Sequence, residues 1–228
     1  MASRRWLLYF SIAASLIYLA STPWHPFPGS PEIKGCAVGA LALLAFQARG
    51  EKRDAVLLSV GLAFSTAGDV LLDLDPQLFV FGLAAFLLAH LTYISLFVRN
   101  RTQPFRPTAA RWIAVAVVIA YAATLSSWIV PSVGPLAAPV VFYICAITTM
   151  VSTAILANFR QRWVAIGAIL FLISDSLLAI HKFKTPVPAR DYLVGITYYL
   201  GQCGIALGVL SSVSNLLPAR GLERTAAV

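Results

Sequence analysis

The sequence alternates between long apolar runs and short polar segments. A run of about 20 predominantly apolar residues is long enough to cross the hydrocarbon core of a bilayer as an α-helix. Eight runs approach or exceed this length, and the segments between them are too short to fold separately. The pattern therefore predicts an all-α polytopic membrane bundle of about eight transmembrane helices, with residues 1–228 as a single integral membrane domain. The expected helices are 5–21, 33–48, 55–74, 78–98, 110–128, 136–157, 163–180 and 192–216.

The composition supports a membrane protein and argues against a nucleic-acid partner. Hydrophobic residues make up 59% of the chain and charged residues only 11%, too few to cover a soluble domain. The net charge is +8, but the basic residues lie in short clusters between apolar runs, as in cytoplasmic loops. Cys36, Cys145 and Cys203 each lie within an apolar run and form no CxxC pair. We expect them to be packing residues without a disulfide or a zinc ion.

The distribution of lysine and arginine predicts the orientation in the membrane, because cytoplasmic loops carry the excess of these residues. If the N-terminus is cytoplasmic, that side holds thirteen of the 17 basic residues and the other side holds four. We therefore expect both termini to be cytoplasmic and the first run to be a retained helix, although it could also be a signal peptide. The four basic residues on the opposite side are Lys34, Lys182, Lys184 and Arg190.

Two aspartates lie inside apolar runs, Asp69 in STAGDVLLDL and Asp175 in LISDSLL. A carboxylate within a membrane helix costs about 2.5–3.5 kcal/mol on insertion scales and is a functional candidate by default. The two aspartates are 106 residues apart, and a tyrosine follows each by 24 residues, Tyr93 and Tyr199. The spacing suggests a parallel four-plus-four internal repeat. The alternative is chance similarity between leucine-rich helices.

Several polar residues could share a site with these aspartates. Ser65, Asp69 and Asp73 are spaced by four residues and therefore share one helix face. Asp73 lies close to the end of its run, where we expect it to be solvated. The other candidates for binding a substrate are Lys34, His90, Tyr93, Lys182, Tyr198, Tyr199 and Gln202. His90 could instead be a packing residue, and the two lysines could extend to lipid phosphates at the membrane surface.

Other catalytic sites find little support in the sequence. It contains no GxSxG, HExxH or Walker motif. His25, His90 and His181 show no spacing typical of a metal site. We therefore expect no metal and no cofactor.

Four segments resemble the YhhN-like membrane proteins, a family that includes animal lysoplasmalogenases. They are GDVLL at 68–72, GLAAFLLAHLTY at 82–93, SDSLLAIHKF at 174–183 and TYYLGQ at 197–202. The chain departs from the family pattern at Lys34, which precedes Gly35 where relatives have proline, and at His181, where animal members commonly have asparagine. The polarity of residue 181 therefore matters more to the pattern than an imidazole does.

The resemblance implies hydrolysis of the vinyl ether bond of a lysoplasmalogen without a metal. The products would be a fatty aldehyde and glycerophosphocholine or glycerophosphoethanolamine. The two intramembrane aspartates are regarded as the catalytic pair of the family, and they correspond to Asp69 and Asp175. A vinyl ether is cleaved by protonating its β carbon, and a carboxyl group in surroundings of low dielectric constant holds a proton for this purpose. One aspartate would serve as general acid and the other as general base.

Two other functions stay open from the residues alone. A proton-coupled membrane carrier would also have buried aspartates and a repeat. A non-enzymatic scaffold would tolerate asparagine in place of either aspartate. For an enzyme, the expected partners are a lysophospholipid substrate and membrane lipids, and the oligomeric state is not predicted. The absence of eukaryotic targeting signals favours a bacterial plasma (inner) membrane.

Overall fold

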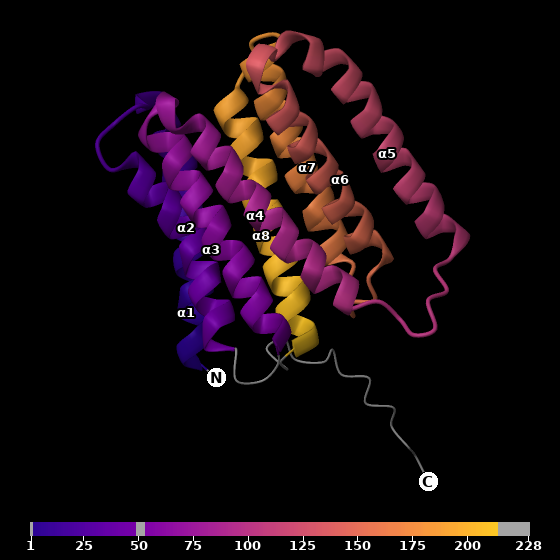
Figure 1. Ribbon diagram of the computed structural model, residues 1–228. Helices are drawn as coiled ribbons and strands as arrows, with labels where there is room; N and C mark the ends of the chain where they lie inside the picture. Colours follow the sequence, from indigo (N-terminus) through magenta and orange to yellow (C-terminus); the bar gives the residue numbers. More distant parts are fainter. Residues whose placement is uncertain (1, 49–52, 214–228) are drawn as a thin grey trace.

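The computed structural model describes residues 2–48 and 53–213, which form a bundle of eight α-helices (Figure 1). The helices are α1 (Ala2–Ser21), α2 (Ser30–Gln47), α3 (Arg53–Leu74), α4 (Phe79–Arg99), α5 (Ala109–Ile129), α6 (Ala137–Leu156), α7 (Trp163–Phe183) and α8 (Arg190–Val213). The predicted all-helical bundle is confirmed. The last predicted residues of the eighth helix, 214–216, lie outside the described part, as do the basic residues Arg49, Lys52, Arg220 and Arg224 used for orientation.

Seven of the described helices are long and apolar enough to cross a membrane. The exception is α2, which has 18 residues and carries Glu32 and Lys34 near its start. Its charged first turns lie beside the end of α3, where Lys34 meets the side chain of Asp73. The polar start of α2 therefore belongs to an internal polar cluster of the bundle.

The helices run alternately up and down, so the connections α1–α2, α3–α4, α5–α6 and α7–α8 all lie at one end (Figure 1). The N-terminus lies at the other end. Helices α3 and α7 run in the same direction, as expected for third members of two four-helix sets. The internal repeat itself stays a prediction.

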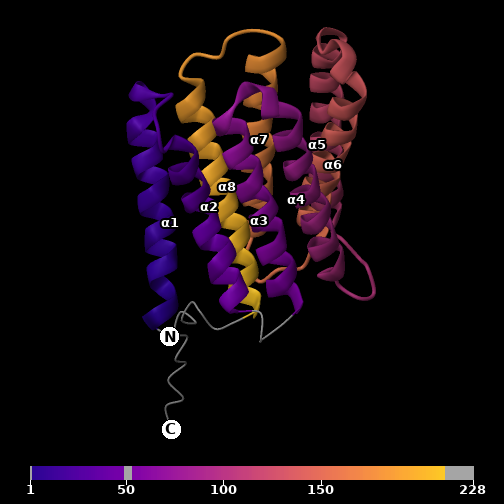
Figure 2. The ribbon, with the colours of Figure 1, turned by 60° about the vertical axis from the view of Figure 1, so that its left-hand side comes forward.

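Helix α8 joins the two parts of the bundle. It packs against α7 and also contacts α1, α2 and α3. Figure 2 shows α1 and α2 on one side, α5 and α6 on the other, and α8 between them. Helix α5 lies at the edge and contacts mainly α6. Residues from both halves of the sequence can therefore meet around α8.

The end of α3 is fixed by its sequence. The residue before a proline is disfavoured in helical conformation, so Asp75-Pro76 ends the helix after Leu74. The Asp75 carboxylate then accepts a hydrogen bond of 2.7 Å from the Gln77 backbone N–H and caps the short turn that follows. This cap sets where α4 begins, directly above the aspartates of α3.

The cysteines are free thiols, and two of them do not pack as expected. Cys36 and Cys145 are exposed on the outside of the bundle, and Cys203 is half-buried. The prediction that they are packing residues is wrong for the first two. Both lie on helix faces that the neighbouring helices leave uncovered, and a membrane-facing cysteine is as compatible with lipid as with a core.

Glycines bring α7 and α8 into backbone contact. A Cβ atom on Gly167 would lie 2.5 Å from the Gly201 carbonyl oxygen and 2.8 Å from the Ile205 backbone nitrogen. Neither backbone atom can move aside without separating the helices. Small residues at such crossings are typical of membrane helix pairs.

We predict that Gly167→Ala lowers the thermal stability of the purified protein in detergent, by about 1–3 kcal/mol, because the added methyl group overpacks this crossing. The matched control is Gly39→Ala, whose Cβ would have its nearest contact at 3.5 Å, with Thr66 Cγ2. That variant should unfold at the temperature of the wild type or above it. Equal losses in both variants would contradict the prediction.

Candidate active site

A cavity of about 560 Å³ lies at the end of the bundle opposite the N-terminus. Its wall includes three aspartates, Asp69 and Asp73 from α3 and Asp175 from α7. The two aspartates predicted to be catalytic therefore lie on one cavity, although they are 106 residues apart in the chain. The cavity is also lined by Tyr198 and Tyr199 from α8.

Asp69 is buried, with 2% of its surface exposed. The Tyr198 hydroxyl from α8 donates a hydrogen bond of 2.6 Å to its Oδ2 atom. Behind this pair, the Tyr93 hydroxyl from α4 donates to Gln202 Oε1 of α8 at 3.0 Å. Gly61 makes room for Tyr93, since a Cβ there would lie 2.6 Å from the tyrosine ring. Helices α3, α4 and α8 are thus joined around Asp69.

Asp175 has a separate tyrosine partner. The Tyr143 hydroxyl from α6 donates a hydrogen bond of 2.5 Å to Asp175 Oδ2. The buried His90 of α4 lies behind it, with its Nε2 atom 3.0 Å from the Tyr143 oxygen and 3.6 Å from Asp175 Oδ2. Sequence reasoning missed Tyr143. The signal was a single tyrosine hydroxyl within the apolar segment VVFYICAI.

A chain of ring contacts connects the surroundings of the two aspartates. Tyr198 packs edge-on against Phe171 at 5.3 Å between ring centres, and Phe171 packs against His90 at 5.1 Å. Phe86 contacts both Phe171 and Tyr198 at 5.9 Å. These rings hold the two tyrosines that bind Asp69 and Asp175. Each carboxylate thus has its own tyrosine donor, and the rings pack the surroundings of the two donors together.

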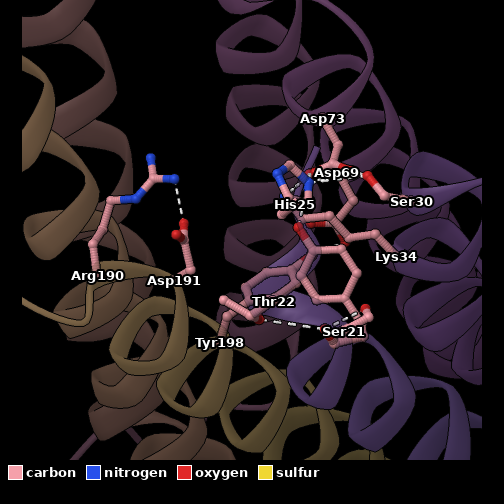
Figure 3. A network of polar contacts seen from close by, with 11 residues as sticks. Ser21, Thr22, His25, Ser30, Lys34, Asp69, Asp73, Arg190, Asp191 and Tyr198 are labelled. Carbon is pink, nitrogen blue, oxygen red and sulfur yellow. Dashed lines mark hydrogen bonds and ion pairs between the residues drawn. The ribbon is translucent and has the colours of Figure 1, made fainter. Parts of the chain in front are cut away.

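Asp73 is not solvated, and this expectation was wrong. Its side chain is only 4% exposed. It accepts a hydrogen bond of 2.7 Å from the Tyr18 hydroxyl and one from Ser30, and it lies 3.2 Å from His25 Nε2 and 3.5 Å from Lys34 Nζ. The cause is the packing of α1, α2 and their connection around the end of α3: Tyr18 comes from α1, Ser30 and Lys34 from α2, and His25 from the connection. Figure 3 shows them gathered around Asp69 and Asp73.

The remaining candidates divide into two groups. Tyr198, Tyr199, Lys34 and Lys182 line the cavity. Ser65, His90, Tyr93 and Gln202 are buried behind its wall. Within residues 2–48 and 53–213, four atoms of this region are buried without a hydrogen-bond partner, Ser65 Oγ, His90 Nδ1, Tyr199 OH and Gln202 Nε2. The polar capacity around the aspartates therefore exceeds what the protein itself satisfies.

Basic groups gather on the rim of the cavity. Lys182, Arg190 and His181 lie there, together with the acidic Asp191. Lys182 Nζ lies 4.7 Å from the centre of the Phe79 ring, and Arg190 is paired with Asp191. His181 Nδ1 accepts a hydrogen bond from the Val187 backbone N–H and so holds the α7–α8 connection. The rim combines positive charge with one acidic group, and Figure 3 shows Arg190 and Asp191 across from Asp73.

A second, apolar cleft of about 70 Å³ adjoins the cavity. It lies between α4, α5, α6 and α7, and its wall is almost entirely aliphatic and aromatic. Asp175 and Tyr143 are its main polar groups, and Asp175 also lines the larger cavity. Asp175 thus stands where a polar space and an apolar space meet.

Comparison with known proteins places this site in a family. Residues 30–209 match the YhhN family. The chain belongs to the YhhN family. A protein of Mycobacterium tuberculosis named lysoplasmalogenase is 34% identical over 183 residues, which cover 77% of this chain and 70% of the relative. Human lysoplasmalogenase TMEM86A is 33% identical over 168 residues, covering 69% and 67% respectively. No solved structure matches the chain.

The YhhN match contains most of the site but not all of it. Asp69, Asp73 and Asp175 lie inside the matched residues 30–209. Tyr18 and His25 lie before residue 30, outside the match. Rat lysoplasmalogenase TMEM86B is 29% identical over a longer stretch of 211 residues, covering 92% of this chain and 85% of the relative. The likeness therefore extends beyond the residues that the family match includes.

The described residues contain no group of three histidine, cysteine, aspartate or glutamate side chains placed to hold a metal ion. The three histidines have different surroundings: His25 contacts Asp73, His90 contacts Tyr143, and His181 contacts the Val187 backbone.

We predict that Lys34→Met destabilises the protein by about 1–3 kcal/mol, because the buried Asp73 carboxylate loses its nearby cation. Adding Asp73→Asn should recover part of this loss, since an amide needs no counter-charge. Thermal unfolding of the two single variants and the double variant in detergent measures the coupling. Lys182→Met is the control and should have little effect. Additive losses would show that Lys34 and Asp73 act separately.

Proposed function

We propose that this protein is a metal-independent lysoplasmalogenase that cleaves a vinyl ether with Asp69 and Asp175. Membership of the YhhN family and the names of its relatives support the substrate class. The observation that carries the proposal is the position of both aspartates on one cavity large enough for a glycerophospho group. Within the described chain, no lysine or arginine lies within 4.0 Å of either carboxylate. Each is therefore free to exchange a proton rather than being fixed as an anion by a basic side chain.

The reaction requires one acid and one base. A protonated carboxyl group gives its proton to C2′, the alkenyl carbon one bond removed from the ether-linked carbon C1′. The double-bond electrons form the new C–H bond, and C1′ and the ether oxygen share the positive charge of an oxocarbenium ion. Water adds to C1′ and gives a proton to a carboxylate. The hemiacetal then breaks its C1′–O bond: the carboxyl group protonated by water gives its proton to the glycerol oxygen, and the hemiacetal hydroxyl gives its proton to the other carboxylate. An aldehyde and an alcohol are left, and both carboxyl groups return to their starting states.

Two carboxyl groups on one cavity can divide these tasks, as in glycoside hydrolysis. The ionised member stabilises the oxocarbenium ion and then accepts the proton of water. Tyr198 and Tyr143 orient Asp69 and Asp175 by donating to one oxygen of each. Ser65, His90, Tyr93 and Gln202 support this arrangement from behind the wall, and Tyr199 lines the cavity beside Tyr198. All of these residues are thus positioning or binding groups around a two-carboxylate centre.

The rim suits the phosphate of a lysophospholipid. Lys182 and Arg190 provide positive charge at the cavity mouth, and Asp191 provides a negative group for a headgroup amine. Lys34 lines the same cavity, but its charge is shared with Asp73. We therefore assign the phosphate chiefly to Lys182, with Arg190, which is paired with Asp191, as a second contact. The products would be a fatty aldehyde and glycerophosphocholine or glycerophosphoethanolamine.

A serine nucleophile is a poor alternative. Ser30, His25 and Asp73 lie together, but Ser30 Oγ and Asp73 both approach the same His25 nitrogen, Nε2, at 3.0 Å and 3.2 Å. In a catalytic triad the two ring nitrogens contact the serine and the acid separately. Ser30 also donates directly to Asp73 and is almost completely buried. The cluster is built to hold the α1–α2 connection in place.

The proposal also includes the location and orientation of the protein in the cell. We propose a bacterial plasma membrane with both termini cytoplasmic, which puts the cavity mouth toward the outer leaflet. Seven described helices are apolar enough to span a membrane, in keeping with an integral membrane protein. Lys182 and Arg190 would then lie on the non-cytoplasmic side because they serve the substrate, against the usual bias of basic residues.

We predict that the purified protein in detergent, with a chelator present, releases aldehyde from a 1-alkenyl lysophospholipid. Asp69→Asn and Asp175→Asn should each lose about 10²-fold or more of this activity, since an amide neither donates nor accepts the required proton. Aldehyde is measured with a coupled dehydrogenase.

Asp75→Asn is the matched control for these variants. Asp75 lies outside the cavity wall and caps the turn after α3, a role that asparagine fills equally well. It should retain wild-type activity. A folded wild-type protein that releases no aldehyde would favour the proton-coupled carrier, and activity lost only with chelator would favour a metal site.

A further inference from the structure

We infer that the apolar cleft between α4, α5, α6 and α7 receives the first carbons of the alkenyl chain, so that C2′ lies beside Asp175. The inference rests on the proposed function. It adds a binding site for the chain and a division of roles between the aspartates, neither of which follows from the position of the cavity alone.

The cleft and the polar cavity share part of their walls. Leu72, Phe79, Phe86 and Leu178 line both spaces, and so does Asp175. The shared wall is apolar except for the one carboxylate. A molecule with a polar end in the cavity and an apolar end in the cleft would therefore have Asp175 beside the point where its two ends join.

The order of groups in the substrate matches the order of surfaces in the protein. From the rim inward, the protein presents basic groups, then the cavity with Asp69, then Asp175, then the aliphatic cleft. A lysoplasmalogen presents phosphate, glycerol, ether oxygen, C1′, C2′ and then the chain. Aligning the two series puts C2′ at Asp175 and puts C1′ on the side of Asp69.

This alignment assigns the proton transfers. Asp175, protonated, forms the new C–H bond at C2′ and becomes a carboxylate. Asp69, ionised, faces C1′, where it stabilises the oxocarbenium ion and accepts a proton from the attacking water. Tyr143 holds Asp175 from the cleft side, and Tyr198 holds Asp69 from the cavity side. Each tyrosine therefore orients one carboxyl group toward one carbon of the vinyl ether.

The size of the cleft limits how much of the chain enters. On the scale on which one water molecule needs about 10–15 Å³, its volume of about 70 Å³ has room for about five groups of that size. A methylene group is similar in size to a water molecule. The first few carbons therefore fit in the cleft, and the rest of a long chain lies outside it, against lipid.

The cleft can be filled from α5 without touching the aspartates. Ala122 lines it and is 5% exposed, whereas the next residue, Ala123, is exposed on the outside of the bundle. Ala122→Phe puts a ring into the cleft, and Ala123→Phe is the matched control that adds the same ring on the lipid side. For a hexadecenyl lysophospholipid, Ala122→Phe should lower kcat/KM by about 10-fold or more, and Ala123→Phe should leave it unchanged.

A binding experiment tests the placement independently of hydrolysis. The probe is a saturated 1-O-hexadecyl lysophosphoethanolamine with a diazirine at the fifth chain carbon, which cannot be cleaved. After illumination, its crosslinks should map to cleft residues of α5 and α6, and Ala122→Phe should reduce them strongly while Ala123→Phe does not. Melting temperatures establish that both variants are folded. If Ala122→Phe fails to fold, Leu125→Ala, which enlarges the cleft, should instead change the pattern of crosslinks.

The outcomes separate the two proposals. Crosslinks on α5 and α6 without aldehyde release from the vinyl ether would support the chain site and overturn the proposed function. Aldehyde release with crosslinks confined to α1, α2 and α3, or with equal kcat/KM for the two alanine variants, would overturn the chain site and the assignment of Asp175. Release from the vinyl ether together with the expected crosslinks supports both.

Discussion

A tyrosine hydroxyl from another helix binds each of the three aspartates on the cavity wall. Tyr198 of α8 binds Asp69, Tyr18 of α1 binds Asp73, and Tyr143 of α6 binds Asp175. A buried carboxyl group in a membrane is costly unless its oxygen atoms are hydrogen-bonded. Because each donor comes from another helix, satisfying the aspartates also fixes the positions of α1, α6 and α8. The arrangement of the bundle around the cavity depends on these three bonds.

The three aspartates differ in what surrounds them, and this difference separates structure from chemistry. Asp73 meets Lys34, His25 and Ser30 in addition to its tyrosine. So many donors and a nearby cation hold it as an anion and make it an anchor for the α1–α2 connection. Asp69 and Asp175 each have one tyrosine donor, with His90 near the latter. Fewer partners leave a carboxyl group able to gain and lose a proton, which is what a general acid or base must do.

The sequence was sufficient to predict the helices and to single out Asp69 and Asp175 as candidates, because both features are strong local signals. Long apolar runs fix the spans, and Asp69 and Asp175 interrupt them. The roles of Tyr143 and His25 could not be predicted in this way. Tyr143 is one hydroxyl in an apolar helix, and only the packing of α6 against α7 brings it to Asp175. His25 lies in a connection whose fold over α3 depends on tertiary contacts. The position of Asp73 near a helix end likewise predicted exposure to solvent. The same connection instead shields its side chain from solvent.

A lipid substrate explains why one protein combines a polar cavity with an apolar cleft. A carrier for a small polar solute would need a polar path, and an apolar cleft that ends beside a carboxyl group would serve no purpose on it. For a molecule that is polar at one end and apolar at the other, the boundary between the two spaces selects which bond is presented. Asp175 lies on that boundary, and Phe86 and Leu72 also line both spaces. In a lysoplasmalogen the vinyl ether lies between the polar and apolar ends, so under the proposed function the boundary would select the bond to be cleaved.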